Sequence, residues 1–383
     1  MKKIVVIFGT RPEAIKLAPV IAELRKRPGV ALSVVATGQH QELVNPLLDD
    51  FGIEPDHRLN LMSSNQGLGD FGGRLLIELS SLLRDEGAEI VVVQGDTGSA
   101  LFGGIAGFFH GAEVAHVEAG LRTHNLRSPF PEEGNRAMLS RVTRYHFAPT
   151  AVSRKNLLDE GIEDGSIYVS GNPVIDALEM EIWRQEGESA ETLDTELLGE
   201  IGTDWRKKPY VLVTGHRREN MDGGFERICE ALKSLTKQFE DYHFIYPVHL
   251  NPNVDGVVRR ELGGIENIRL ISPQDYRPFV RLLSGCYLVL TDSGGIQEEA
   301  PALGKPVLVM RDTTERPEGV DAGTVRLVGS SVEKIVESVA ELLKNQEVYT
   351  RMSQSRNPYG DGRAAERIAD VLCGEVSEKG ENG

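Results

Sequence analysis

Short apolar runs rich in β-branched residues alternate with helical patterns along almost the whole of this 383-residue chain. The strand-like runs form two series. The first series comprises residues 3–8, 32–37, 89–94, 112–118, 145–150 and 167–171, and the second comprises residues 209–215, 242–249, 267–272, 287–292 and 305–311. Helical patterns lie between them, at residues 13–26, 97–109, 225–239 and 277–284. This alternation predicts βαβ units and parallel sheets, and hence a doubly wound α/β protein.

The chain is longer than one typical core requires, so two domains are expected. An acidic stretch without strand character, residues 183–205, follows the first series. We therefore predict an N-terminal Rossmann-like lobe over residues 1–172 and a C-terminal Rossmann-like lobe over residues 173–360, with a ligand cleft between them. Residues 361–383 are expected to supply a final helix and a disordered tail.

Composition excludes several classes of partner. The net charge of −16 provides no basic excess for nucleic acid or for an anionic membrane surface. No segment approaches the roughly 18 apolar residues that a membrane span needs, and the apolar run at residues 4–8 is too short for a signal peptide. Three cysteines without a CxxC pair fit a reducing compartment, so we predict a cytoplasmic protein.

Common cofactor fingerprints are missing from the sequence. GTRPEA stands where a GxGxxG would follow the first strand, and neither a Walker-type GxxxxGK[ST] nor an HExxH occurs. We therefore predict no dinucleotide cofactor and no metal site.

The stretch from Thr291 to Glu318 reads TDSGGIQEEAPALGKPVLVMRDTTERPE and begins where a strand-like run ends. In open α/β sheets ligands bind at the carboxyl ends of strands. Gly294 and Gly295 let the backbone approach an anion, and the helix that follows directs its N–H groups at that anion. Glu298 or Glu299 can accept hydrogen bonds from sugar hydroxyls. The element is typical of a nucleotide cradle, although a plain strand–turn–helix also needs glycine.

Charged residues follow two strands of the first series. Arg11 and Lys16 lie at the start of a helix, where they can supply positive charge to a cleft or can simply be solvated. Asp96 lies at a strand's carboxyl end, as a catalytic carboxylate would, but a helix N-cap occupies the same place.

The segment 116–136 carries an unusual density of charge for a loop between a strand and a helix. Glu118 stands at an apolar strand end, where an unpaired carboxylate is costly. Glu132 and Glu133 follow a Pro-Phe-Pro sequence, with Arg136 four residues beyond Glu132. We therefore interpret the segment as functional.

The second series of strands adds further candidates. His216 follows a strand and can donate to a phosphate or carry a proton, or can serve as a cap. Phe279 is a candidate to stack on a base, but an isolated phenylalanine is more often part of the core.

Together these motifs resemble one family. GTRPEAIK, GDT, HVEAGLRT with PFPEEGNR, TGHRREN, PQDY with its nearby PF, and DSGGIQEEAP with LGKPVLVMRDTTERPE resemble the non-hydrolysing UDP-N-acetylglucosamine 2-epimerases. The motifs run from about residue 8 to about residue 330, which is nearly the whole chain. The resemblance implies a GT-B fold, a homodimer, and a C-terminal helix that packs back on the first lobe.

The resemblance also assigns residues by motif position. It places in the catalytic set Lys16, Asp96, Glu118, Glu132 and His216. It places around UDP the residues Arg11, Arg136, Gln274, Phe279, Ser293, Gly294, Gly295, Glu299 and Arg316. Within that set it implies that Ser293 and Gly295 meet the pyrophosphate, that Glu299 meets the ribose and that Phe279 meets the uracil.

The sequence departs from the family at the allosteric site that many bacterial members have for a second UDP-sugar. That site would draw on Gln39, His40 and Gln66. Glu42 and Asn65 replace the expected groups beside them, and Glu42 would face an anionic ligand. We therefore expect substrate activation to be altered or lost.

The implied reaction is reversible inversion at C2 of UDP-N-acetylglucosamine by elimination of UDP and its re-addition to a glycal. Asp96, Glu118 and Glu132 would serve as two proton carriers and a supporting partner, in an order that the sequence leaves open. Four alternatives remain: a hydrolysing 2-epimerase, an epimerase of a diacetamido uronic-acid sugar nucleotide, a GT-B glycosyltransferase and a catalytically silent UDP-sugar sensor.

Overall fold

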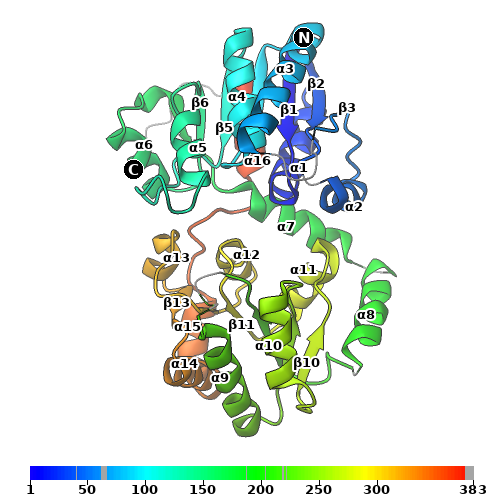
Figure 1. The fold of residues 1–383 in the computed structure, drawn as a ribbon, viewed down its shortest axis with the longest axis vertical. Helices are drawn as coiled ribbons and strands as arrows, with labels where there is room; N and C mark the ends of the chain where they lie inside the picture. The colour runs from blue at the N-terminus through cyan, green and yellow to red at the C-terminus, as the bar shows by residue number, and fades with distance from the viewer. Residues whose placement is uncertain are drawn as a thin grey trace. The chain divides into compact units, whose positions relative to one another are not determined.

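The computed structural model describes residues 1–39, 41–61, 67–186, 188–202, 204–217, 220 and 222–375. The chain divides into two compact units (Figure 1). Unit 1 comprises Met1–Ala177 together with the segment that returns at Tyr359, and unit 2 comprises Leu178–Pro358.

Unit 1 is built on a parallel sheet. Among its described residues seven strands pair in the order β3-β2-β1-β4-β5-β6-β7. The strands are β1 (Lys2–Phe8), β2 (Val30–Ala36), β3 (His57–Arg58), β4 (Ile90–Gln94), β5 (Glu113–Val117), β6 (Tyr145–Ala148) and β7 (Ile167–Val169). The helices are α1 (Arg11–Lys26), α2 (Gln41–Phe51), α3 (Leu68–Glu86), α4 (Gly98–His110), α5 (Glu132–Leu139), α6 (Ala151–Asp159), the first part of α7 (Pro173–Arg184) and α16 (Ala364–Cys373), with a short 3-10 helix at Asp164–Ser166.

Unit 2 repeats the architecture with a second parallel sheet. Its described part contains six strands in the order β10-β9-β8-β11-β12-β13. The strands are β8 (Tyr210–Thr214), β9 (His243–Pro247), β10 (Ile268–Ile271), β11 (Leu288–Thr291), β12 (Val307–Val309) and β13 (Val325–Leu327). The helices are the rest of α7, α8 (Glu188–Ile201), α9 (Gly224–Gln238), α10 (Pro252–Leu262), α11 (Tyr276–Gly285), α12 (Ile296–Ala302), α13 (Pro317–Asp321), α14 (Val332–Lys344) and α15 (Gln346–Ser353). The two Rossmann-like units confirm the predicted doubly wound α/β class.

The central strands explain why the sequence folds in this way. Every residue of β4 and of β8 is buried, as expected for parallel strands that are covered by helices on both faces. Helices therefore separate consecutive strands, and the carboxyl ends of neighbouring strands gather at one edge of each sheet. The last helix, α16, packs against α1 in unit 1.

In the part of the chain that the structure describes, none of the helices combines the length and the apolar character that crossing a membrane would require.

Candidate active site

Glu118 follows β5 and is constrained both at its backbone and at its side chain. Its φ angle is +64°, a value that is uncommon for a residue with a side chain and costs about 1–3 kcal/mol. Its side chain is only 4% exposed. A carboxylate held in this conformation and largely out of water needs compensating partners, and it has several.

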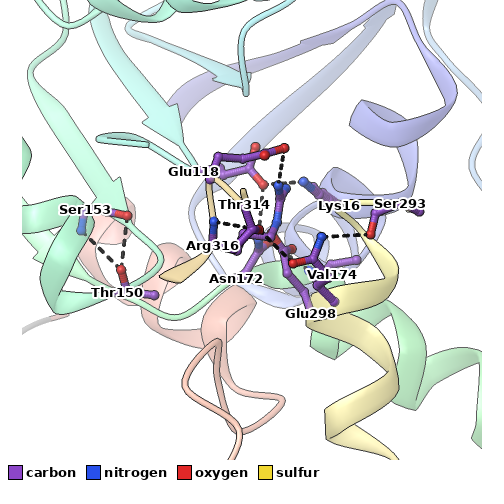
Figure 2. Close-up of polar contacts among 12 residues, drawn as sticks. Lys16, Glu118, Thr150, Ser153, Asn172, Val174, Ser293, Glu298, Thr314 and Arg316 are labelled. Atoms are coloured by element: carbon purple, nitrogen blue, oxygen red, sulfur yellow. Dashed lines mark hydrogen bonds and ion pairs between the residues drawn. The ribbon is translucent and has the colours of Figure 1, made fainter. Parts of the chain in front are cut away.

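The Glu118 carboxylate accepts hydrogen bonds on both oxygens. Lys16 of α1 and the side-chain amide of Asn172 donate to Oε1, the latter over 3.1 Å (Figure 2). Gln94 donates to Oε2 over 2.8 Å, and Arg136 approaches the same oxygen at 3.3 Å. Two cations and two neutral amides therefore fix one carboxylate, and the ionised form is the one that this arrangement favours.

Arg136 of α5 joins two of the predicted carboxylates. Its Nη2 lies 2.5 Å from Asp96 Oδ2, and its Nη1 donates to the backbone carbonyl of Glu118. Burial alone would lower the pKa of Arg136, but the charges of Asp96 and Glu118 outweigh burial and raise that pKa. The arginine thus stays charged and holds the loops after β4 and β5 together.

The helix that follows Asp96 is capped by the next residue. Thr97 is the N-cap of α4 and accepts a hydrogen bond from the Ala100 amide over 3.0 Å. The alternative interpretation of Asp96 as an N-cap is therefore wrong, because Thr97 takes that role. The Asp96 side chain instead pairs with Arg136 and is 32% exposed, so it is more accessible than Glu118.

Two consecutive glutamates open α5 and differ in their surroundings. Glu133 accepts the backbone amides of Thr123 and His124, over 3.0 and 2.9 Å, and so shapes the preceding loop. Glu132 has a buried Oε2 without a hydrogen-bond partner in the described structure. Because Glu132 precedes Arg136 by four residues on one helix, the two lie on the same face of α5. The orphan oxygen is the feature by which Glu132 differs from Glu133, whose two oxygens both accept backbone amides.

A buried glutamate that sequence reasoning missed links two of these loops. Glu13 of α1 is 1% exposed and accepts the backbone amides of Gly9 and Thr10, together with the hydroxyl of Thr97 over 2.6 Å. Burial raises its pKa to about 7, against the hydrogen bonds, which lower it. Glu13 therefore joins the turn before α1, which precedes Arg11, to Thr97, which follows Asp96.

In unit 2, Asp292 organises the loop that carries His216. This fully buried carboxylate follows β11 and accepts the amides of His216 and Arg217, both at 2.9 Å, and the side chain of Asn220 at 3.2 Å. The Nδ1 of His216 lies 3.3 Å from Asp292 Oδ1. Burial lowers the pKa of His216, while Asp292 acts in the opposite direction. The ring of His216 stacks on that of His249, with the two ring centroids 5.5 Å apart.

The DSGG segment lies between β11 and α12, and side chains from two directions hold it. The amide of Ser293 donates to the Thr291 hydroxyl over 2.9 Å, and Gln297 donates to the Ser293 carbonyl over 3.1 Å. Thr314 in turn donates to Gln297 Oε1 over 2.8 Å. Gly295 is the N-cap of α12 and makes no side-chain capping bond. The loop is therefore preorganised by its neighbours.

Arg316 lies against this loop. A Cβ added at Gly294 would be 2.5 Å from Arg316 Nη1, so the glycine gives the guanidinium room to approach the backbone. Arg316 also pairs with Glu298 at 2.5 Å and with Glu315 at 3.0 Å. Burial opposes ionisation of Glu315, but Arg316 and Arg311 outweigh it and lower its pKa to about 2.

The remaining predicted UDP residues of unit 2 have identifiable partners. Glu299 of α12 accepts a hydrogen bond from the buried Tyr276 hydroxyl over 3.2 Å. Gln274 donates to Glu200 over 2.7 Å. Phe279 of α11 is partly buried and packs against the core, in agreement with the alternative that it is a core residue. Its stacking on a base stays a prediction.

The predicted allosteric residues are only partly described. Gln39 accepts a hydrogen bond from Ser99 over 2.8 Å. His40 and Gln66 lie outside the described residues, as does Asn65. Arg11, in contrast, is placed as the first residue of α1.

Several residues that organise the site escaped sequence reasoning. They are Glu13, Gln94, Asn172 and Asp292. Gln94, Asn172 and Asp292 lie at or shortly after the end of a strand. A polar residue that follows an apolar run was the signal in the sequence that could have identified them. Among the described residues, no group of three or more histidine, cysteine, aspartate or glutamate side chains could hold a metal ion.

Comparison with known proteins gives a consistent result. The family model for UDP-N-acetylglucosamine 2-epimerase matches residues 22–373. The UDP-N-acetylglucosamine 2-epimerase of Escherichia coli K12 is 50% identical over 371 residues, which cover 97% of this chain and 98% of that protein. The Campylobacter jejuni enzyme of the same name is 46% identical over 375 residues, 97% of either chain.

Solved structures agree. The UDP-GlcNAc 2-epimerase of Neisseria meningitidis, bound to UDP-GlcNAc, has a TM-score of 0.89 and 43% identity, covering 98% of this chain and 100% of that chain. The Methanocaldococcus jannaschii UDP-GlcNAc 2-epimerase in complex with UDP-GlcNAc and UDP has a TM-score of 0.81 and 33% identity. The match covers 97% of this chain and 99% of that chain. The chain therefore belongs to the UDP-N-acetylglucosamine 2-epimerase family.

Proposed function

We propose that this protein is a non-hydrolysing epimerase that interconverts UDP-N-acetylglucosamine and UDP-N-acetylmannosamine. Relatives at about half identity over nearly the full chain are named for the epimerase, and the Neisseria meningitidis neighbour binds UDP-GlcNAc. The product would serve the synthesis of surface polysaccharide or glycan precursors. The family resemblance further implies a homodimer, which light scattering on the purified protein tests.

The reaction must invert a carbon whose proton is barely acidic, because no carbonyl is attached to C2. Elimination solves this problem. A carboxylate takes the C2 proton while the C1–O bond to UDP breaks, which leaves a C1=C2 glycal and UDP. A second acid then protonates C2 on the opposite face, and a β-phosphate oxygen of UDP re-forms the bond to C1. Both products of the first step must stay bound for the second step to occur.

Unit 1 supports the proton transfers. The observation that carries the proposal is the joining of Asp96 and Glu118 through Arg136, together with the unpaired Oε2 of Glu132. Three carboxylates in three environments are suited to three tasks. We assign proton exchange to the accessible Asp96 and to Glu132. We assign to the tightly held Glu118 the orientation of Lys16 and Arg136 beside the reacting carbons.

Unit 2 supports retention of UDP. The DSGG segment offers backbone N–H groups beside the Arg316 guanidinium, and His216 projects from the neighbouring strand end with its orientation fixed by Asp292. Donors that are fixed before the reaction stabilise a developing diphosphate without reorganisation at the moment of bond breaking. UDP held in this way can return to C1 instead of being lost, which favours the reversible enzyme over the hydrolysing one.

Proton NMR of the protein with UDP-GlcNAc in D₂O, without NAD, metal or acceptor, tests this function. We expect deuterium at C2 and a growing UDP-ManNAc signal. Accumulation of free UDP with free N-acetylmannosamine would replace the proposal with the hydrolysing enzyme. A lack of exchange at C2 would direct attention to a uronic-acid sugar nucleotide or to a transferase.

A further inference from the structure

Asn172 lies where the chain passes between its two units. The chain leaves unit 1 after Ala177 and returns at Tyr359, so two segments make the crossing. Asn172 is fully buried at the start of the outgoing segment, and its backbone amide donates to the Tyr359 carbonyl over 2.7 Å. One residue therefore joins the outgoing and the returning segments on the unit 1 side.

The outgoing and returning segments contact each other around this junction. Gly171 has φ +87°, and a Cβ added there would lie 3.4 Å from the Cα of Gly360 and 3.5 Å from the Cβ of Ala364. Asp176 accepts the amides of Ala364 and Ala365 over 3.2 and 2.8 Å, which fastens the first turn of α7 to α16. Asn172 is consequently anchored by its surroundings.

The carboxamide of Asn172 is used at both ends (Figure 2). Its Nδ2 donates to Glu118 Oε1 over 3.1 Å, and its Oδ1 accepts from the Val174 amide in the first turn of α7 over 3.2 Å. A planar amide with both ends engaged has one orientation. The Glu118 carboxylate is thus connected through a single side chain to the helix that continues past Ala177 into unit 2.

We propose that Asn172 is a positioning residue that holds the Glu118 carboxylate in its working orientation against the first turn of α7. The inference rests on the proposed function, because it assumes that Glu118 serves the epimerisation. Glu118 is strained at its backbone, and its side chain needs fixed donors to remain in that conformation. Lys16 has a long and flexible stem, whereas Asn172 is fixed by the fold.

The charges that surround Glu118 determine what a change at Asn172 would do. Lys16 of α1 and Arg136 of α5 contact the carboxylate directly, and Asp96 lies on the far side of Arg136. His116 on β5 is buried, and burial holds its pKa well below the ordinary value, so it adds no charge near neutrality. A new anion at position 172 would face the Glu118 carboxylate, and Arg136, one of the two cations beside that carboxylate, is already shared with Asp96.

The first test is Asn172→Asp. Aspartate keeps an oxygen for the Val174 amide but replaces the Nδ2 donor with a second acceptor. We expect kcat for epimerisation to fall about 100-fold, and the acid limb of the kcat–pH profile to move to higher pH because like charges raise a carboxylate pKa. We expect the Kd for UDP, measured by calorimetry, to match that of the parent.

Two further variants keep the test decisive. Asn172→Ser retains a hydroxyl for the Val174 amide, cannot reach Glu118 and adds no charge. It should lower kcat by about tenfold with little movement of the pH profile. Asn267→Asp is the matched control in unit 2, where the Asn267 amide donates only to backbone carbonyls. It should lower the melting temperature and leave the pH profile unchanged.

The parent's own activity separates this inference from the proposed function. An inactive parent overturns the proposed function and the inference with it. If the parent is active and both Asn172 variants keep its kcat and pH profile, the inference alone fails. The inference also fails if both variants lose kcat and have a lower melting temperature while their kcat–pH profiles stay where the parent's profile lies. That result would describe a purely structural residue.

Discussion

The two units each place a buried carboxylate just beyond a strand, but they hold it in different ways. In unit 1, Glu118 is held by side chains, two of which are cations. In unit 2, Asp292 is held mainly by the backbone amides of His216 and Arg217. Glu118 is strained at its own backbone, whereas Asp292 shapes the backbone of another loop. The same type of side chain serves two purposes.

The difference matches the two demands of the reaction. The side-chain cations gathered around Glu118 produce a strong local field beside Asp96, one of the two carboxylates to which we assign proton exchange. Amides gathered around a carboxylate produce a rigid loop, and a rigid loop suits the recognition of a diphosphate. We therefore expect changes at Glu118 to affect turnover and changes at Asp292 to affect UDP binding.

The largest expected effect is that of Glu118→Gln. The substitution removes the negative charge that both Lys16 and Arg136 contact, and it leaves the buried Arg136 and the partly buried Lys16 without that partner. We expect kcat to fall by about 10³-fold, and the free energy of unfolding to fall by about 3 kcal/mol. Steady-state kinetics and urea unfolding measure the two quantities, while calorimetry should give an unchanged Kd for UDP.

The matched variant in unit 1 is Asp96→Asn, at the more exposed carboxylate. It should reduce kcat to a similar extent but cost much less stability, because water already solvates part of the side chain. If both variants instead kept kcat and weakened UDP binding, the division of labour between the units would be wrong.

Asp292→Asn should produce the next largest effect, and we expect that effect on the Kd for UDP instead of on kcat. The new amide turns a donor toward the His216 and Arg217 amides, so the loop loses a partner for at least one buried N–H. An unsatisfied buried donor costs about 1–3 kcal/mol, which corresponds to a Kd for UDP about 50-fold weaker. Loss of the Asp292 charge should also lower the pKa of His216 further.

Asp255→Asn is the control for this change. Asp255 lies on α10 of unit 2 and pairs with Arg259 at the surface. The same substitution there should leave UDP affinity and turnover at parental values. An equal loss of affinity in both variants would mean that Asp292 acts through general destabilisation of unit 2.

A smaller effect is expected from Gly294→Ala. The added methyl group would meet Arg316 Nη1 and displace the guanidinium from the loop. We expect the Kd for UDP to rise about tenfold with kcat unchanged, because one charge-assisted contact is weakened. Gly256→Ala on α10 is the control, since a Cβ there meets nothing within 4 Å. Equal affinity in the two alanine variants would contradict the role of Gly294.

The fold was predictable from the sequence because strand and helix periods are local properties. The apolar runs that predicted β1, β4, β8 and β11 all became buried parallel strands. The short strands β3 and β13 were missed, because strands of two and three residues carry little periodicity. Thr97 rather than Asp96 caps α4, since both residue types make good caps and only the geometry distinguishes them.

The candidate site was predictable only where a residue type implies its own chemistry. Glu118 was predictable because a carboxylate at an apolar strand end is costly. Asn172 was not, because an asparagine before a proline is ordinary loop composition. Its importance comes from a contact with Glu118 across 54 positions of the sequence, and no local pattern encodes such a contact. Glu13 occupies the third helical position of a capping box, as the sequence alone would suggest. Only the folded structure shows that it also accepts a hydrogen bond from the Thr97 hydroxyl.

The last variant, Glu13→Gln, should lower turnover by less than about tenfold, and it adds a third carboxylate to the comparison between Glu118 and Asp292. Glu13 carries no cationic partner in its hydrogen bonds, unlike Glu118, and burial raises its pKa from 4.5 to about 7. The folded state therefore binds a proton more tightly than the unfolded chain does. Stability from this group is complete below pH 4.5 and is lost as the pH rises through 7, an effect worth about 3 kcal/mol.

Urea unfolding of the parent and of Glu13→Gln, at several values between pH 4.5 and pH 8, measures this effect. Glutamine cannot ionise, so the stability of the parent relative to the variant should decline across that range and then level off. A difference that rose with pH would mean that the hydrogen bonds from Gly9, Thr10 and Thr97 hold Glu13 ionised. The neutral donors of unit 1 would then resemble the amide donors around Asp292, and the contrast between the units would be reduced to the cations at Glu118.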